Sequence, residues 1–285
     1  LGACATGTPA ATAPGAVAVD VPAVAHPAGE TPQWWYRSGA ARAAGSGAMD
    51  GKAKNVILFL GDGMGISTIT AARIYEAQKR GETGEENTLS FERFPNLAMV
   101  KTYNTNAQVP DSAGTATAMH SGLKTRIGVL GIGPEAEKGV CKDALAHPLP
   151  LLGEEVKARG LALGIVTTTR ITHATPASVY SRSADRDWEA DSNIPADQQG
   201  QGCKDIAQQL ADAKFDVALG GGTAVFYGKD KERSGRRIDA GADLPRAWAA
   251  ANGGTVVKTA AELAAAPMDK PVLGLFNPSH LTFMA

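Results

Sequence analysis

The sequence predicts an α/β protein, a three-layer α/β/α sandwich around a mostly parallel sheet, C-terminally incomplete in this chain. Continuous apolar runs such as residues 55–60 are typical of strands buried on both faces of a parallel sheet. Stretches with helical spacing follow such runs and end at glycine, as residues 66–80 do before Gly81. This alternation is typical of doubly wound sheets, which bind ligands at the carboxyl ends of their strands.

The individual elements follow from the same patterns, taken along the chain. Strands are predicted over apolar runs, and helices over stretches of helical spacing. The predicted strands are residues 55–60, 97–102, 161–168, 215–219, 255–257 and 272–276. The predicted helices are residues 31–44, 66–80, 151–159, 203–214 and 259–266.

Composition limits the classes of function. With 285 residues, 44% of them hydrophobic, the chain is long enough for one large α/β domain. A formal net charge of −1 gives no basic field, so we expect no nucleic-acid binding role. No apolar run approaches the about 20 residues that a membrane-spanning helix needs.

We divide the chain into a flexible Ala/Gly/Pro-rich tether (1–30), an N-terminal helix and connection (31–54) and a globular domain (55–285). Alanine, glycine and proline dominate the tether, which cannot bury enough surface to fold alone. It opens Leu-Gly-Ala-Cys, which resembles the end of a bacterial lipoprotein signal and makes Cys4 a lipidation candidate. That interpretation implies export to the periplasm or cell envelope; the alternative is a small-residue tail with an incidental cysteine.

A glycine-rich turn follows the first predicted strand and carries Asp62. The glycines of Gly61-Asp-Gly-Met-Gly65 let backbone and ions approach the carboxylate closely. Neither of the usual glycine-rich nucleotide-loop spacings is present, which argues against a nucleotide site. A turn with a capping aspartate remains the alternative.

The segment Val109-Pro-Asp-Ser-Ala-Gly-Thr-Ala-Thr117 predicts a helix that begins near Ser112. The free N–H groups at a helix start favour a bound phosphate. A serine hydroxyl needs a base or a metal to become a nucleophile. Because no Gly-x-Ser-x-Gly elbow is present, metal activation fits better than a Ser-His-Asp triad. The alternative is that Ser112 merely caps the helix.

A third polar cluster follows the strand predicted at 161–168. His173 and Thr175 offer a nitrogen and an oxygen to a divalent cation, and Arg186 offers a planar fork to two phosphate oxygens. The alternatives are an ordinary loop histidine and a salt-bridged surface arginine.

Together these segments resemble the alkaline phosphatase family. Residues 109–117 resemble its active-site signature, and residues 55–65, 173–176 and 184–188 occur in the order that the family has. Residues 202–206, with Cys141, resemble the cysteine pair of the animal-type branch. The resemblance implies that residues 55–285 are the N-terminal part of the catalytic domain.

The resemblance also implies the reaction. Ser112 would attack the phosphorus of small phosphomonoester substrates, and water would then hydrolyse the phosphoserine. Arg186 would clamp the phosphate, and Asp111 would orient Arg186. Two Zn²⁺ ions and one Mg²⁺ ion are implied as cofactors, stabilising the attacking and leaving oxygens.

The metal ligands are assigned by the same resemblance. Asp62 would bridge a zinc and the magnesium, Ser112 would bind zinc, Thr175 would bind magnesium, and His173 would lie in the second shell. The family takes its other ligands from a C-terminal segment, so we expect the chain alone to be inactive. The remaining histidines match no ligand: His26, His120, His147 and His280.

The pair Cys141 and Cys203 is expected to form a disulfide, by that resemblance and by the exported context. The chain-entropy model gives such a loop about 4 kcal/mol of stabilisation. Two unrelated buried thiols are the alternative. A homodimer is implied by the family. Two alternative functions stay open, a non-catalytic phosphate-binding protein and a phosphodiesterase or sulfatase relative.

Overall fold

The computed structural model describes residues 24, 31–45, 47, 53–94 and 97–283. They belong to two compact units, residues 1–59 and 60–285, which are treated separately. Cys4 and almost all of the predicted tether lie outside the described residues, and the predicted domain boundaries stay predictions. In the described part of the chain, no helix is long and apolar enough to cross a membrane.

The first unit contributes helix α1, Pro32–Gly45, which confirms the helix predicted at 31–44. The strand predicted at residues 55–60 does not form. Its apolar side chains are exposed, with Val56 at 83% and Phe59 at 86%. The run has the composition of a buried strand, but no strand among the described residues pairs with it.

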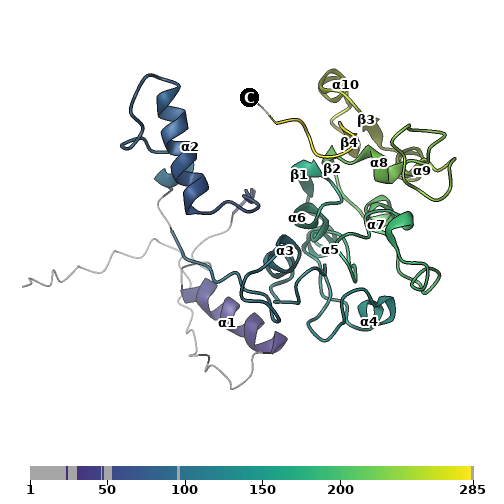
Figure 1. The fold of residues 1–285 in the computed structure, drawn as a ribbon, viewed down its shortest axis with the longest axis horizontal. Helices are drawn as coiled ribbons and strands as arrows, with labels where there is room; N and C mark the ends of the chain where they lie inside the picture. The colour runs from purple at the N-terminus through teal and green to yellow at the C-terminus, as the bar shows by residue number, and fades with distance from the viewer. Residues whose placement is uncertain (1–23, 25–30, 46, 48–52, 95–96, 284–285) are drawn as a thin grey trace, which may run out of the picture. The chain divides into compact units, whose positions relative to one another are not determined.

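The second unit is organised around a sheet of four parallel strands (Figure 1). These are β1, Gly164–Arg170; β2, Val217–Gly221; β3, Thr255–Val257; and β4, Val272–Leu275. Their order in the sheet is β1-β2-β4-β3, and every pairing is parallel. The predicted parallel α/β fold is therefore confirmed, with each of these strands within a few residues of its predicted place.

The prediction of a strand at residues 97–102 is also wrong, as was the prediction at residues 55–60. The segment forms no strand, and Leu97 and Met99 are 95% and 91% exposed. A parallel strand exists only through hydrogen bonds to neighbours that are distant in sequence. An apolar run shows that a segment can be buried, but not that a neighbour is present.

Helices precede the first strand of this sheet and also lie in the connections between its strands. In the second unit they are α2, Ile66–Gln78; α3, Ser112–Ser121; α4, Cys141–Ala146; α5, Leu152–Ala158; α6, Ala174–Ala177; α7, Ile206–Asp212; α8, Thr223–Phe226; α9, Leu244–Asn252; and α10, Ala260–Ala265. Two short 3₁₀ turns, Ser90–Arg93 and Asp191–Asn193, complete the set.

The five helices predicted in this unit, the one beginning near Ser112 among them, are present, with differences at their ends. Helix α7 begins at Ile206 rather than at residue 203, because the Asp205 side chain accepts a hydrogen bond from Gln208 N–H and caps it. Helix α9 was not predicted, although it has good signals. Asp243 caps it, and Gly253 ends it in a left-handed conformation with φ 62°.

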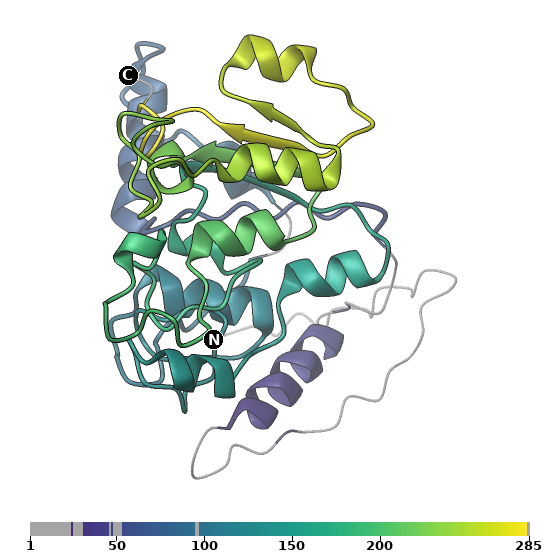
Figure 2. The same ribbon diagram turned by 90° about the vertical axis from the view of Figure 1, so that its right-hand side faces the viewer.

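The main hydrophobic core joins the sheet to its helices. It includes Ile165 of β1 and Leu273 of β4, each at most 6% exposed. Helix α9 covers one face of the sheet (Figure 2), where the Trp248 ring stacks on Phe215 at 5.1 Å between centroids. A second, smaller core surrounds Cys141. The sheet and helix α6 after β1 form the frame on which the candidate site is built.

Candidate functional site

Ser112 is the first residue of helix α3, and Asp111 is its cap. The Asp111 carboxylate accepts a hydrogen bond of 3.0 Å from Gly114 N–H, while its backbone is extended. The alternative in which Ser112 itself caps the helix is therefore wrong. The Ser112 hydroxyl is free of that task and stands half-buried at the positive end of the helix dipole.

Each carboxylate oxygen of Asp111 accepts two hydrogen bonds. Oδ1 accepts hydrogen bonds from Gly114 N–H and from Asn104 Nδ2 at 3.1 Å. Oδ2 accepts from Gly128 N–H at 3.1 Å and from Arg186 Nη1 at 3.0 Å. Burial alone would raise the pKa of Asp111, but the backbone donors and Arg186 outweigh it and lower the pKa. Asp111 thus stays ionised beside the serine.

Asn104 is a supporting residue that the sequence did not indicate. It is 3% exposed and fits against Gly114, where a Cβ atom would meet Asn104 Oδ1 at 2.6 Å. Glycine at position 114 is therefore required by the close approach of this side chain. No local pattern marks Asn104, because the contact joins a loop to the helix that follows it.

Arg186 lies between Asp111 and His173. Its Nη1 binds Asp111, its Nη2 lies 3.1 Å from His173 Nε2, and its backbone N–H donates to Gly128 O. The structure brings together the residue predicted to clamp phosphate and the residue predicted to orient it. The guanidinium is fixed from one side and remains about one-fifth exposed.

Asp62, Thr175 and His173 form the second half of the site. Thr175 Oγ1 donates to Asp62 Oδ2 at 2.7 Å, and His173 Nδ1 lies 3.8 Å from the same oxygen. That Nδ1 is buried and has no hydrogen-bond partner. Burial, followed by the charges of Arg186 and Arg170, lowers the pKa of His173, which keeps the ring neutral.

Two of these side chains fit a divalent cation. The Asp62 carboxylate and the Thr175 hydroxyl are oxygen ligands that such ions accept. His173 is a neighbour and not a ligand, because Arg186 Nη2 can only donate to His173 Nε2, and the neutral ring then carries its proton on Nδ1. Within the described ranges, however, no group of three or more His, Cys, Asp or Glu side chains surrounds one point. Asp62 and Thr175 are therefore two candidate oxygen ligands, and the described residues alone hold no complete metal site.

A second polar network lies at the carboxyl end of β1, next to His173. The Arg170 guanidinium binds Glu189, which is 8% exposed, with Nη2···Oε1 at 2.6 Å. Arg170 Nη1 also lies 2.9 Å from His280 Nε2, and the His280 ring is 5.4 Å from that of His173. His280 matched no ligand in the sequence analysis, and the structure places it beside the site through Arg170.

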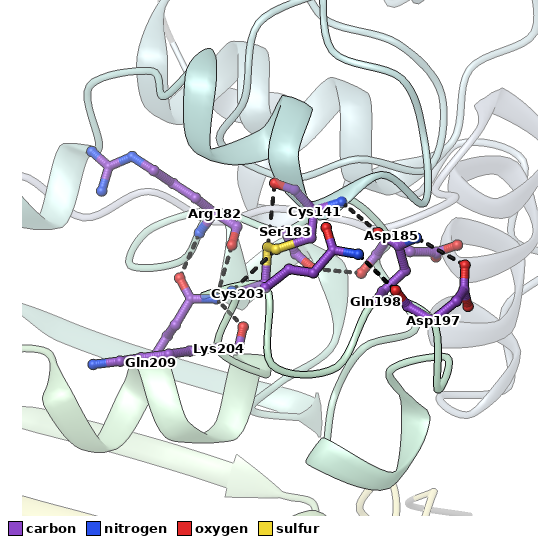
Figure 3. The surroundings of a disulfide bond; sticks show 10 residues. Cys141, Arg182, Ser183, Asp185, Asp197, Gln198, Cys203, Lys204 and Gln209 are labelled. Atoms are coloured by element: carbon purple, nitrogen blue, oxygen red, sulfur yellow. Dashed lines mark hydrogen bonds between the residues drawn. A yellow bond between two sulfur atoms is a disulfide. The ribbon is translucent and has the colours of Figure 1, made fainter.

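The predicted disulfide Cys141–Cys203 is confirmed, with Cα atoms 5.7 Å apart (Figure 3). It joins the start of α4 to the segment before α7. Cys141 N–H donates to the Gln198 side chain, and Gln209 bridges Arg182 and Lys204 nearby. The closed loop includes β1 and α6.

The fold and the site together define a class of protein. The second unit is a parallel α/β fold in which an arginine fixed by an aspartate, a serine at a helix start and a carboxylate–hydroxyl pair lie near the end of β1.

Comparison with known proteins identifies the family. The alkaline phosphatase family model matches residues 53–285, so the chain belongs to the alkaline phosphatase family. It is similar to the tissue-nonspecific alkaline phosphatase of Gallus gallus, with 44% identity over 81% of this chain and 48% of that protein. It is 42% identical to an alkaline phosphatase of Gadus morhua, over 81% of this chain and 52% of that protein. The chain thus spans about half the length of these relatives.

Solved structures agree with this assignment. The alkaline phosphatase of Thermus thermophilus matches with a TM-score of 0.58 and 29% identity, over 77% of this chain and 39% of that one. A cold-active alkaline phosphatase from Shewanella matches with a TM-score of 0.58 and 26% identity, over 78% and 46%. The predicted family and fold are confirmed.

Proposed function

We propose that this chain is part of an enzyme that hydrolyses small phosphate monoesters through a phosphoserine at Ser112. The observation that carries the proposal is the pair Asp111–Arg186 at the start of the helix that Ser112 opens, in a member of the alkaline phosphatase family. A fixed guanidinium and a helix N-terminus beside a serine hydroxyl together suit a phosphate under attack.

The roles of the side chains follow from their contacts. Arg186 binds two phosphate oxygens, and Asp111 keeps the guanidinium aimed because it is itself fixed by two backbone N–H groups. Ser112 attacks phosphorus, the leaving alcohol departs, and water then releases phosphate from the serine. Preorganised charges of this kind stabilise charge that develops in the transition state.

Metal ions are part of the proposal. We infer two Zn²⁺ and one Mg²⁺, with Asp62, Ser112 and Thr175 as ligands from this chain and His173 in the second shell. When bound, such ions favour the deprotonated serine and neutralise charge on the transferred group. The support is the contact of Asp62 with Thr175, which brings a carboxylate oxygen and a hydroxyl within 2.7 Å of each other. Metal analysis of the purified complete gene product tests the stoichiometry.

The covalent step is tested by trapping. The complete gene product is incubated with labelled phosphate at acid pH, digested, and mapped by mass spectrometry. Label is expected on Ser112, and Ser112→Ala should remove both label and turnover. Ser192→Ala, an exposed serine on a 3₁₀ turn, serves as the matched control with unchanged activity. Label on another residue, or full turnover in Ser112→Ala, contradicts the proposal.

The alternative functions are separated by substrate. A phosphodiesterase or sulfatase relative would prefer bis-p-nitrophenyl phosphate or p-nitrophenyl sulfate to p-nitrophenyl phosphate. A non-catalytic protein would bind inorganic phosphate in calorimetry and turn over none of the three. We further propose that residues 1–285 alone are inactive, which the same assay tests beside the complete gene product.

Export to the periplasm or cell envelope is also proposed. The disulfide supports it, because such bonds persist in oxidising compartments. A lipid anchor at Cys4 and a homodimer are proposed from the sequence alone. Mass spectrometry of the native N-terminus and sedimentation of the purified protein test these two.

A further inference from the structure

A buried histidine on the nucleophile helix has no role in the proposed reaction. His120 lies eight residues after Ser112 on α3, and it is 7% exposed. Its Nδ1 atom is 2.7 Å from Ser178 Oγ, at the end of α6. This contact therefore joins the helix of Ser112 to the helix of Thr175.

The direction of the hydrogen bonds can be assigned. Ser178 Oγ donates its single proton to the Thr175 backbone carbonyl at 3.0 Å. The hydroxyl must then accept from the imidazole, so His120 carries its proton on Nδ1. The network runs from His120 through Ser178 to the backbone of Thr175, whose side chain reaches Asp62.

Helix α6 needs such support because it is short. It contains four residues, Ala174–Ala177, which is too few to be stable by themselves. Its main neighbours are helix α3 and strand β1. The contact with His120 is thus a polar link that helps to fix where Thr175 stands relative to Ser112.

The imidazole is suited to a constant, uncharged link. Burial lowers the pKa of His120 to about 4, so the ring stays neutral around neutral and alkaline pH. A neutral ring keeps one donor and adds no charge near the phosphate site.

We propose that His120 is a positioning residue. As the Nδ1–H tautomer it holds Ser178, and through Ser178 the backbone of Thr175, in a fixed position relative to the helix that begins at Ser112. The effect on turnover rests on the proposed phosphatase function. The tautomer and the fixing of α6 do not, and they are measured separately.

Four variants of the complete gene product test the effect on turnover. His120→Leu removes the donor and keeps an apolar side chain of similar size, and Ser178→Ala removes the relay. Each should lower kcat for p-nitrophenyl phosphate about tenfold with little change in KM, because small misplacements of reacting groups are costly. His120→Asn, whose amide nitrogen takes the place of Nδ1, should restore kcat to within about threefold of wild type. Exposed His147→Gln is the control and should match wild type.

Coupling between the two residues gives a second readout. The double variant His120→Leu/Ser178→Ala should be no slower than the slower single variant, because both break one link. Full multiplication of the two losses would show independent effects and overturn the proposal.

Nuclear magnetic resonance tests the link without any activity. The ¹⁵N shifts of His120 should report a neutral Nδ1–H ring from pH 6 to 9, and the Ser178 amide should exchange faster in His120→Leu than in His147→Gln. An Nε2–H tautomer, or unchanged exchange together with unchanged kcat, overturns the proposal. If no variant and no wild type turns over phosphate esters, the proposed function fails, and the tautomer and exchange results alone decide this inference.

Discussion

Removing the disulfide should cost a large part of the stability of the second unit. The variant Cys141→Ala/Cys203→Ala opens a loop whose ends are 62 residues apart in sequence. In the chain-entropy model a loop of that length restricts the unfolded chain by about 4 kcal/mol. Alanine is chosen because Cys141 is fully buried among apolar residues, where serine would add an unpaired hydroxyl.

The assay is urea unfolding followed by tryptophan fluorescence, with thermal unfolding beside it. A loss of 4 kcal/mol corresponds to a midpoint roughly 10 °C lower for a unit of this size. Reductant should lower the wild-type midpoint by a similar amount and leave the double variant unchanged. Cys4→Ala is the matched control and should behave as wild type. A wild-type free energy of unfolding that reductant lowers by less than about 0.5 kcal/mol would refute the reasoning.

Three further predictions concern single residues. Arg186→Ala should weaken inhibition by phosphate by about 10- to 100-fold, because it removes charge-assisted hydrogen bonds, while Arg182→Ala, far from Ser112 in its contacts, should not. Gly114→Ala should lower the unfolding free energy by about 1 to 3 kcal/mol, measured in urea, because its Cβ would meet Asn104 Oδ1 at 2.6 Å. The unfolding free energy should fall as pH falls from 6.5 to 4, since unfolded His120 binds a proton that the buried ring, with a pKa of about 4, refuses. The fall in unfolding free energy between pH 6.5 and 4 should be larger in wild type than in His120→Leu, by up to about 3 kcal/mol. An equal fall in the two proteins would contradict this role of His120.

Local signals in the sequence predicted local structure well. The glycine at position 81, the helical spacing of residues 259–266 and the apolar run of β4 each predicted an element close to its observed place. The failures are non-local. Residues 55–60 and 97–102 have strand composition, but a strand also needs a partner, and nothing in a single run reports one.

The same division holds for the site. Asp111 and Ser112 stand in one motif, and the helix start between them follows from short-range chemistry. The approach of Asn104 to Gly114 and of His120 to Ser178 joins segments by tertiary packing. Such contacts leave no periodicity or spacing in the sequence. The sequence therefore contains no signal for Asn104, and it indicates no role for His120.

The order of the sheet has a practical consequence for anyone who prepares this chain. Among the described residues β1 pairs only with β2, so the first residues of its other side have no strand beside them, while near its end Thr168 C=O accepts from Leu281 N–H. Val166 on this strand is 72% exposed, and nearby Leu161 is 56% exposed. An open, apolar strand edge is a template on which a second copy of the chain can add its own strand. Aggregation of a protein consisting of residues 1–285 should therefore rise steeply with its concentration. Keeping the protein dilute and cold should reduce this aggregation, because apolar association weakens on cooling.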